Sequence, residues 1–309
     1  MIWLELYRWK WLGIRTLKLD ENYTVGHMES ASSAKSHFLG TMKITLESYE
    51  TLSNNGEKSI NKNEIEKNYC LEGLSIDGDL DAILTQLEAF NAYFKNDERH
   101  QTINMNLLFY GPSGTGKSEL ARYIADQLDR KIICKRISDL QSMYVGEGEK
   151  NIKRAFQEAE AEEAVLVIDE ADSLLFSRDK ARHSWEISFT NEFLTQMEKF
   201  RGILVCTTNR LDDLDSASLR RFNHKIGFDY LTAEGNLLFY DIFLKSLTFD
   251  KLDSISREDL KRIEKLAPGD FKLVRDRYSF HPHSDINHAM LIDALKNESK
   301  LKTVLRQGK

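Results

Sequence analysis

The sequence has few cysteines and no pattern that would use them together. Cys70, Cys134 and Cys206 are the three cysteines in 309 residues, and no two of them form a C-x-x-C pair. Neither a disulfide framework nor a zinc site is therefore expected, and a reducing compartment is favoured. Cys134 and Cys206 lie inside apolar runs, which predicts that each packs as a small hydrophobic side chain.

Long apolar segments are also missing. The first residues, MIWLELYRWKWLGI, are interrupted by Glu5, Arg8 and Lys10, so they lack the continuous apolar core of a signal peptide. No 18 consecutive residues are apolar, so no membrane-spanning helix is expected. The sequence predicts a soluble, cytoplasmic protein without a membrane partner. The H-E-x-x-H motif of zinc proteases is absent as well, so degradation of a substrate would need a partner protein.

A strongly basic composition is missing too. The net charge is −6, so nothing in the composition favours nucleic acid, although a local basic path stays possible. The chain is 41% hydrophobic, which is enough to bury a sizeable core in one or two domains. Residues 1–68 form a poorly defined N-terminal region. Three of the four tryptophans crowd into its first 11 residues, and residues 51–68 are polar and turn-rich, which is typical of a linker.

What the sequence does contain is a complete phosphate-binding loop. GPSGTGKS matches G-x-x-x-x-G-K-[ST] in full, between the apolar residues 107–110 and a segment with helical spacing. Glycines let the backbone fold around a phosphate, and the following helix adds its dipole. Lys117 supplies a charge for the β- and γ-phosphates, and Ser118 supplies a hydroxyl for Mg²⁺. The residues expected to bind the nucleoside triphosphate are Gly111, Pro112, Ser113, Gly114, Thr115, Gly116, Lys117, Ser118 and Glu119.

Two adjacent acids, Asp169 and Glu170, end a later apolar run, VLVIDE. A carboxylate in this position can hold Mg²⁺ through water, and the next carboxylate can act as general base on the water that attacks the γ-phosphate. Two acids at the end of a strand are common by themselves. The assignment therefore depends on the complete phosphate loop that precedes them.

Apolar strands alternate with helices through the middle of the chain, which indicates a parallel sheet covered on both faces and ligands at the carboxyl ends of its strands. After Tyr230 all spacing is helical. The sequence predicts an α/β domain of the P-loop NTPase class over residues 69–230 and a small all-helical lid domain over residues 231–309. Helices are expected at residues 80–94, 147–161 and about 185–200, and strands at residues 107–110, 131–137, 165–169 and 202–209.

Five segments together resemble a known family. GPSGTGKS, MYVGEGEKNI, VLVIDEAD, CTTNRLDDLD and LRRF occur in the order and spacing of the AAA+ ATPases, and they look most like the AAA clade, whose members remodel proteins. The resemblance covers about residues 70–300. It implies a Mg²⁺-dependent ATPase that assembles into a ring, with six subunits as the expected number. It also implies that hydrolysis drives remodelling or translocation of a polypeptide.

The resemblance extends to residues around the reacting phosphate. Asn209 matches the sensor-1 position, on a strand between the phosphate-loop strand and the Asp-Glu strand, where an amide can orient the attacking water. Arg220 and Arg221 match the arginine fingers that reach a neighbouring subunit's nucleotide. Here the pair directly precedes Phe222, whereas many relatives carry R-P-G-R-F. Which arginine acts in trans therefore stays open.

On the lid, Gly269 stands where the family's helical domain meets the nucleotide, and a small residue there lets the lid approach closely. The sensor-2 arginine of other AAA+ proteins is missing. Arg275, one turn further on, is a candidate for a partial substitute. Residues 73–76 are candidates for adenine recognition through backbone and apolar groups.

Tyr144, Val145 and Gly146 match the family's pore-loop motif, an aromatic residue followed by a hydrophobic one and glycine. In a ring such loops grip an extended chain through sequence-tolerant contacts. The alternative is that Tyr144 packs on its own subunit. Residues 177–185 lie where the family has a second, basic pore loop, although a solvated charged face is the favoured interpretation.

Three other functions stay open at this point. One is a scaffold that binds ATP without hydrolysing it, against which the intact Lys117, Asp169 and Glu170 argue. An AAA+ loader or transposition-type partner would act on nucleic acid, which the net negative charge and the pore motif disfavour. A small-molecule P-loop kinase would need neither the arginine pair nor the pore motif.

Overall fold

The computed structural model describes residues 70–95, 104–144, 146–175, 184–211, 214–282 and 285–307. They all belong to Ile60–Lys309, the second of two compact units into which the chain divides. The predictions for residues 1–68, for Val145 and for residues 177–183 lie outside these ranges. Within them, no helix is both long enough and apolar enough to cross a lipid bilayer.

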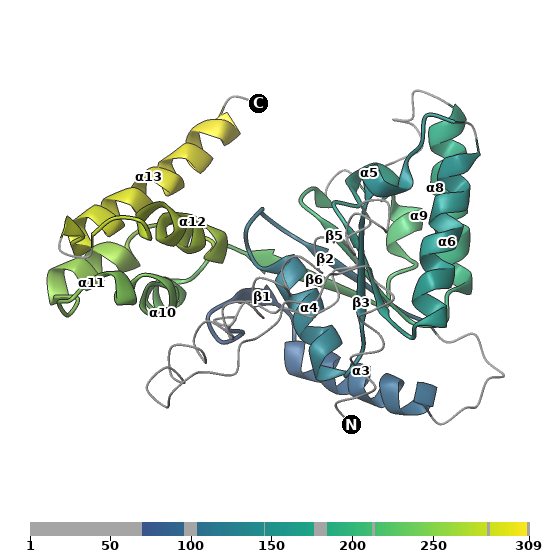
Figure 1. Ribbon diagram of the computed structural model, residues 1–309, viewed down its shortest axis with the longest axis horizontal. Coiled ribbons are helices and arrows are strands. Elements are labelled where there is room, and N and C mark those ends of the chain that lie inside the picture. The colour runs from purple at the N-terminus through teal and green to yellow at the C-terminus, as the bar shows by residue number, and fades with distance from the viewer. Residues whose placement is uncertain are drawn as a thin grey trace, which may run out of the picture. The chain divides into compact units, whose positions relative to one another are not determined.

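A six-stranded, mostly parallel sheet forms the centre of the α/β part (Figure 1). Its strands, in spatial order, are β1 (Ser75–Asp77), β6 (His224–Asp229), β2 (Met105–Tyr110), β5 (Ile203–Thr208), β4 (Val165–Asp169) and β3 (Ile132–Arg136). All neighbours are parallel except β1 and β6. The predicted fold class is confirmed, but β1 and β6 were not expected. β1 is only three residues long, and β6 mixes polar with apolar residues instead of forming a continuous apolar run.

The helices of this part cover both faces of the sheet, as Figure 1 shows. Because side chains alternate along a strand, Leu166 and Ile168 of β4 join the core under one set of helices, while Val165 and Val167 join the core under the other. The first core lies under α6 and α8, and the second lies under α3 and α4. The helices are α3 (Leu80–Lys95), α4 (Lys117–Gln127), α5 (Ile137–Leu140), α6 (Glu147–Ala161), α7 (Asp172–Leu175), α8 (Ser184–Lys199) and α9 (Ser216–Leu219).

The chain after β6 is helical and has a core of its own. Phe239, Tyr240 and Phe243 pack there against Phe271 and Leu295. The elements are α10 (Ala233–Phe243), the 3-10 helix η4 (Lys245–Leu247), α11 (Ser254–Lys261), α12 (Pro268–Tyr278) and α13 (His288–Gln307). The helical character predicted for this region is confirmed. The boundary of the lid domain at residue 231 stays a prediction.

The first turn of α12 is held from two sides. Pro occupies its first position, which suits a helix start because proline lacks an N–H group. The Asp270 carboxylate accepts a hydrogen bond from the Ala267 N–H at 2.7 Å. The same carboxylate forms an ion pair with Lys302 of α13, whose ammonium group also lies 5.1 Å from the centre of the Tyr230 ring.

The two cysteines of the strands differ. Cys206 is fully buried in β5, as expected, but Cys134 is exposed and that prediction is wrong. Its strand, β3, is one of the two edge strands of the sheet and has a neighbouring strand on one side only. All three cysteines are free thiols.

A candidate nucleotide site

The loop between β2 and α4 depends on its glycines. Gly111, Gly114 and Gly116 have φ angles of 139°, 79° and 101°, in the region that side chains with a Cβ atom avoid. A Cβ atom on Gly111 would also lie 2.0 Å from the carbonyl oxygen of Phe228. The glycine spacing of the motif therefore follows from the path of the backbone.

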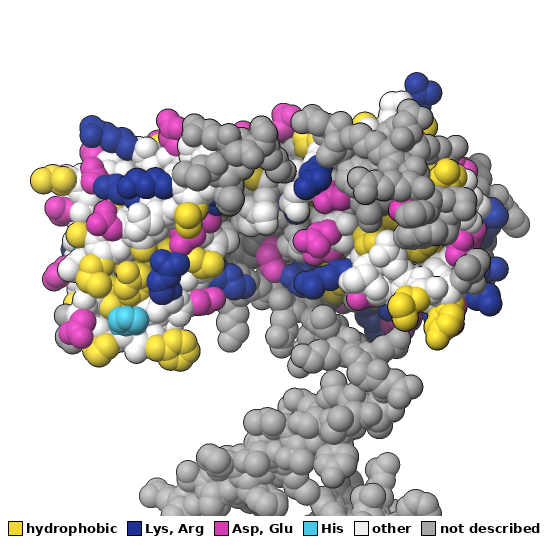
Figure 2. Space-filling model, turned by 90° about the horizontal axis from the view of Figure 1, so that it is seen from above, with side chains coloured by type: hydrophobic (Ala, Val, Ile, Leu, Met, Phe, Trp, Pro, Cys, Tyr) yellow, Lys and Arg dark blue, Asp and Glu magenta, His cyan; other side chains and the backbone are white. Residues whose placement is uncertain are grey.

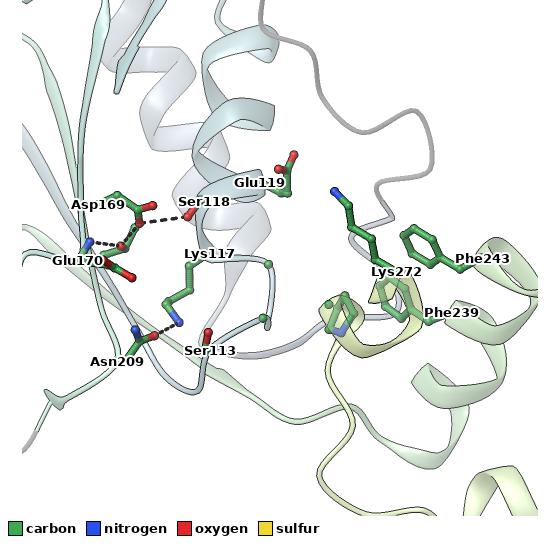
Figure 3. Close-up of a pocket in the computed structure, with 15 residues that line it drawn as sticks. Ser113, Lys117, Ser118, Glu119, Asp169, Glu170, Asn209, Phe239, Phe243 and Lys272 are labelled. Carbon is green, nitrogen blue, oxygen red and sulfur yellow. Dashed lines mark hydrogen bonds between the residues drawn. The ribbon is translucent and has the colours of Figure 1, made fainter. Parts of the chain in front are cut away.

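Lys117 begins α4 and extends back along the loop (Figure 3). Its amino group donates hydrogen bonds to the carbonyl oxygens of Gly111 and Pro112 at 2.8 and 2.7 Å, and to Oδ1 of Asn209 at 2.9 Å. Burial lowers the pKa of this amino group from 10.5 to about 8, against the opposing attraction of Asp169 and Asp172. A poorly solvated ammonium group at the base of the loop is a site for an anion.

Ser118 faces the carboxyl end of β4. Its hydroxyl donates a hydrogen bond to Oδ1 of Asp169 at 3.1 Å, and the same oxygen accepts a hydrogen bond from the Thr207 hydroxyl at 2.5 Å. A hydroxyl and a carboxylate this close are hard oxygen donors of the kind that Mg²⁺ takes together with phosphate oxygens. Ser118 and Asp169 therefore fit a magnesium ion.

Glu170 follows Asp169, is exposed, and has an unusual backbone conformation. Its φ angle is 56°, which costs a residue with a side chain about 1–2 kcal/mol. The surrounding strand ends hold this conformation. The Thr207 hydroxyl accepts the Glu170 N–H at 3.1 Å, and the Thr207 carbonyl oxygen accepts the Ala171 N–H at 2.8 Å. Strain of this kind clusters at functional sites.

Asn209 follows β5, which lies between β2 and β4 as the sequence led us to expect. Asp172 fixes this strand end, because its carboxylate accepts hydrogen bonds from the Thr208 hydroxyl and from the Asn209 N–H, the latter at 3.3 Å. The Asn209 side chain is thus aimed at Lys117 and at the space in front of it.

The lid closes the other side of the site. The Gly269 N–H donates a hydrogen bond to the Gly114 carbonyl oxygen at 2.9 Å. A Cβ atom on Gly269 would lie 3.1 Å from the Gly114 Cα atom, so a larger residue would push the two segments apart. Gly269 therefore stands directly against the phosphate loop.

Together these elements enclose a pocket of about 260 Å³ (Figure 3). Sequence reasoning did not assign five of its residues: Thr207, Phe239, Phe243, Pro268 and Lys272. The pocket is lined by Ser113, Gly114, Gly116, Lys117, Ser118, Glu119, Asp169, Glu170, Thr207, Asn209, Phe239, Phe243, Pro268, Gly269 and Lys272.

Arg275, the candidate substitute on the lid, is not among these residues. Its guanidinium lies 5.2 Å from the centre of the Phe243 ring and is hydrogen bonded to Asp276 at 2.9 Å. Residues 73–76 do not line the pocket either. Gly73 instead packs behind the pocket wall, since a Cβ atom there would lie 2.7 Å from the Phe239 ring.

The two arginines before β6 differ in their contacts. Nε of Arg221 lies 2.6 Å from a carboxylate oxygen of Glu198, and its Nη1 donates a hydrogen bond to the Ala217 carbonyl oxygen at 2.7 Å. The Arg220 side chain is exposed and has no hydrogen bond or ion pair with any residue that the structure describes. Neither arginine lines the pocket of its own chain.

The segment before α6 presents two large hydrophobic side chains to solvent. Met143 is 95% exposed and Tyr144 is 70% exposed. The Tyr144 side chain is therefore mostly outside the core of its own subunit. The backbone N–H of Tyr144 donates a hydrogen bond to the Ser142 hydroxyl at 3.2 Å. Gly146, with a φ angle of 81°, is the N-cap residue of α6.

The glycine loop after β2, the acid pair at the end of β4 and the amide after the strand between them have the arrangement that is typical of P-loop nucleoside triphosphatases. Residues 107–230 match the model of the "ATPase family associated with various cellular activities (AAA)". Over these residues the chain is similar to the AAA family.

The chain is also similar to curated proteins. Spastin of Xenopus laevis is 32% identical over 170 residues, which are 53% of this chain and 28% of that protein, and spastin of Danio rerio is 33% identical over 170 residues. The chain thus spans less than a third of the length of these relatives. A crystal structure of the FIGL-1 AAA domain in complex with ADP has the same fold, with a TM-score of 0.52 and 22% identity, covering 72% of this chain and 86% of that one.

Proposed function

We propose that this protein binds ATP with Mg²⁺ and hydrolyses it to ADP and phosphate. The observation that carries the proposal is one pocket in which the phosphate-loop residues Lys117 and Ser118 face Asp169, Glu170 and Asn209. A scaffold that only binds ATP has no use for the carboxylate beside the Ser118–Asp169 pair. A glycine loop alone would support nucleotide binding and nothing further.

The chemical roles follow from the positions of the side chains. Glu170 takes a proton from water as that water attacks the γ-phosphate, and it releases the proton to solvent, to which it is exposed. Asn209 orients the water and the γ-phosphate, and Lys117 stabilises the charge on the transferred group. Ser118 and Asp169 would hold Mg²⁺, which would supply positive charge beside the phosphate oxygens. The aromatic side chains Phe239 and Phe243 offer an apolar surface for the adenine base.

We propose further that the active form is a ring, with six subunits as the expected number. The support is Arg220, which is exposed and outside the pocket of its own chain. An arginine at this position has a catalytic use only if it enters the nucleotide site of a neighbouring copy. Arg221 is held by Glu198 and is assigned a structural role.

A polypeptide is the substrate that the surface favours. Met143 and Tyr144 form an exposed hydrophobic pair, which suits sequence-tolerant contacts with an extended chain. On the face shown in Figure 2, acidic and basic side chains are interspersed among the residues described, unlike the basic path that nucleic acid requires. The reducing cytoplasm is the proposed compartment, in keeping with three free thiols.

An unfolded polypeptide should therefore stimulate ATP turnover, and the Tyr144→Ala variant should lose this stimulation while it keeps its basal rate. The basal rate depends on groups in the pocket, which Tyr144 does not line. Phosphate release is measured with permanently unfolded protein, with single-stranded DNA and with neither. Stimulation by DNA alone, or equal stimulation of Tyr144→Ala and wild type, contradicts the proposal.

Nucleotide affinity should fall as the pH rises through about 8. The Lys117 amino group has a pKa of about 8 in this structure, so it loses its charge above that pH and attracts phosphate less. Bound triphosphate favours the charged form, so binding at about pH 8.5 should take up part of a proton. Calorimetry in buffers of different ionisation enthalpy measures this uptake, and its absence contradicts the assignment.

The lowered pKa of Lys117 has the opposite effect on folding stability, which should rise with pH. Between about pH 8 and 10.5 the unfolded chain binds more protons at Lys117 than the folded chain does. The cost of burying the charge is present below about pH 8 and is relieved as the pH rises through this window. For this group alone, the nucleotide-free protein gains stability over the pH range in which it loses affinity.

A further inference from the structure

We infer that Lys272 is a second phosphate-binding cation of this pocket, supplied by the lid and directed at the inner phosphates of the nucleotide. This inference rests on the proposed nucleotide binding. It goes beyond it because the sequence pattern assigns no cation to the lid except Arg275, whose guanidinium lies over Phe243.

The position of Lys272 in α12 brings it to the pocket. It follows Gly269 by three residues, so both lie on the same side of the first turn of the helix. Gly269 is hydrogen bonded to the phosphate loop at Gly114, and this contact fixes the start of α12 against the loop. Lys272 lines the pocket with Gly269, whereas Arg275, another turn along, does not.

The charges in the pocket favour a cation on the side formed by the lid. Among the lining residues, three carry carboxylates (Glu119, Asp169 and Glu170) and two carry amino groups (Lys117 and Lys272). One oxygen of Glu119 pairs with Arg122, while the other is buried without a hydrogen-bond partner in the described part of the chain. Figure 3 shows the Lys272 side chain extending toward the Glu119 side of the pocket. An entering polyphosphate adds negative charge where a carboxylate oxygen is already poorly balanced.

The placement also indicates which phosphates Lys272 reaches. In Figure 3, Asp169, Glu170 and Asn209 lie on one side of the pocket, and Lys272, Phe239 and Phe243 lie on the other, with the phosphate loop between them. The reacting γ-phosphate belongs beside Glu170, and the base belongs beside the aromatic side chains. Lys272 therefore meets the part of the nucleotide between them, which comprises the α- and β-phosphates.

A cation at that point contributes to binding and not to the chemical step. ADP and ATP share the inner phosphates, so both gain from Lys272 to the same extent. Because the contact is equal in the ground state and the transition state, its loss raises KM and leaves kcat almost unchanged. The contact would therefore persist after the γ-phosphate has been released, because ADP retains the α- and β-phosphates.

The test is nucleotide binding and turnover by Lys272→Ala and Lys272→Arg. Lys272→Ala should weaken ADP and ATP equally, by roughly five- to tenfold, as expected for a partly solvated charge-assisted contact. It should keep kcat within about twofold. Lys272→Arg should restore most of the affinity. Lys245→Ala is the matched control, since it removes a lid lysine that does not line the pocket and whose ion pair with Asp241 spans 4.0 Å.

The outcomes separate this inference from the proposed function. If wild type binds ADP and ATP, and Lys272→Ala binds both equally well, the inference fails and the ATPase proposal stands. Loss of ATP affinity alone, or a fall in kcat at unchanged KM, also overturns it, because Lys272 would then act on the γ-phosphate. If wild type binds neither nucleotide, both proposals fail. Equal losses in Lys272→Ala and Lys245→Ala would indicate a general effect on the lid and would contradict the inference.

Discussion

Glu170→Gln should reduce ATP turnover by roughly 10²–10³-fold and leave ATP bound, because an amide has the shape of the carboxylate but cannot accept the proton of the attacking water. The substitution should not disturb the fold. The Glu170 side chain is exposed, and the hydrogen bond that holds this residue comes from its backbone N–H to Thr207. Phosphate release and equilibrium binding of ATP, measured on the same preparation, check both parts.

The matched control is Lys117→Ala, which removes the buried ammonium group at the base of the loop and should abolish binding itself. A Glu170→Gln variant that turns over ATP at the wild-type rate would refute the general-base assignment. If the ATP-bound variant also retains polypeptide, the trapped complex identifies the substrate directly.

Arg220→Ala should lower turnover by roughly 10³-fold, the lower end of the range for arginine fingers, without weakening ATP binding in its own chain. The reason is that Arg220 lies outside its own pocket and that its side chain has no hydrogen bond or ion pair with the described residues. Arg221→Ala should cost mainly stability, about 1 kcal/mol, since it loses a partly exposed pair with Glu198. Steady-state turnover and thermal unfolding of the two variants distinguish these roles.

Mixing the two inactive variants gives a sharper result than either variant alone. Glu170→Gln subunits keep the arginine, and Arg220→Ala subunits keep the carboxylate. If each site draws on two neighbours, about a quarter of the sites in a randomly assembled equal mixture combine an intact base with an intact arginine. Turnover should then reappear on mixing. No recovery, although gel filtration shows mixed assemblies, would contradict a shared site, and recovery with Arg221→Ala instead would reverse the arginine assignment.

The sequence was sufficient for the part of the site that is contiguous or that follows from strand order. The glycines and Lys117 form one segment whose backbone path requires them. Asp169 and Asn209 end buried apolar strands, and parallel strands bring their carboxyl ends to a common edge. The family resemblance implied that the strand of Asn209 lies between the other two, and the sheet has that order.

The rest of the site depends on contacts that no local pattern records. Thr207 lies within an apolar strand, and its hydroxyl matters only because Asp169 ends the adjacent strand. Phe239 and Phe243 have the four-residue spacing that is typical of a helix packed on a core, and both side chains do lie in the helical core. Nothing in that spacing indicates that their rings also line a pocket. The difference between Arg220 and Arg221 is set by Glu198 on α8, a helix far away in sequence. Lys272 could have been found only from its three-residue distance to Gly269.

The ion pair between Lys302 and Asp270 connects α13 to the helix that lines the nucleotide pocket. Asp270 holds the start of α12, and α12 carries both Gly269 and Lys272 into the pocket. If a partner protein bound α13 and drew Lys302 away from Asp270, the start of α12 would lose this support and the affinity for nucleotide would change. Thermodynamic linkage makes this relation reciprocal, so bound nucleotide must change the affinity for that protein by the same factor.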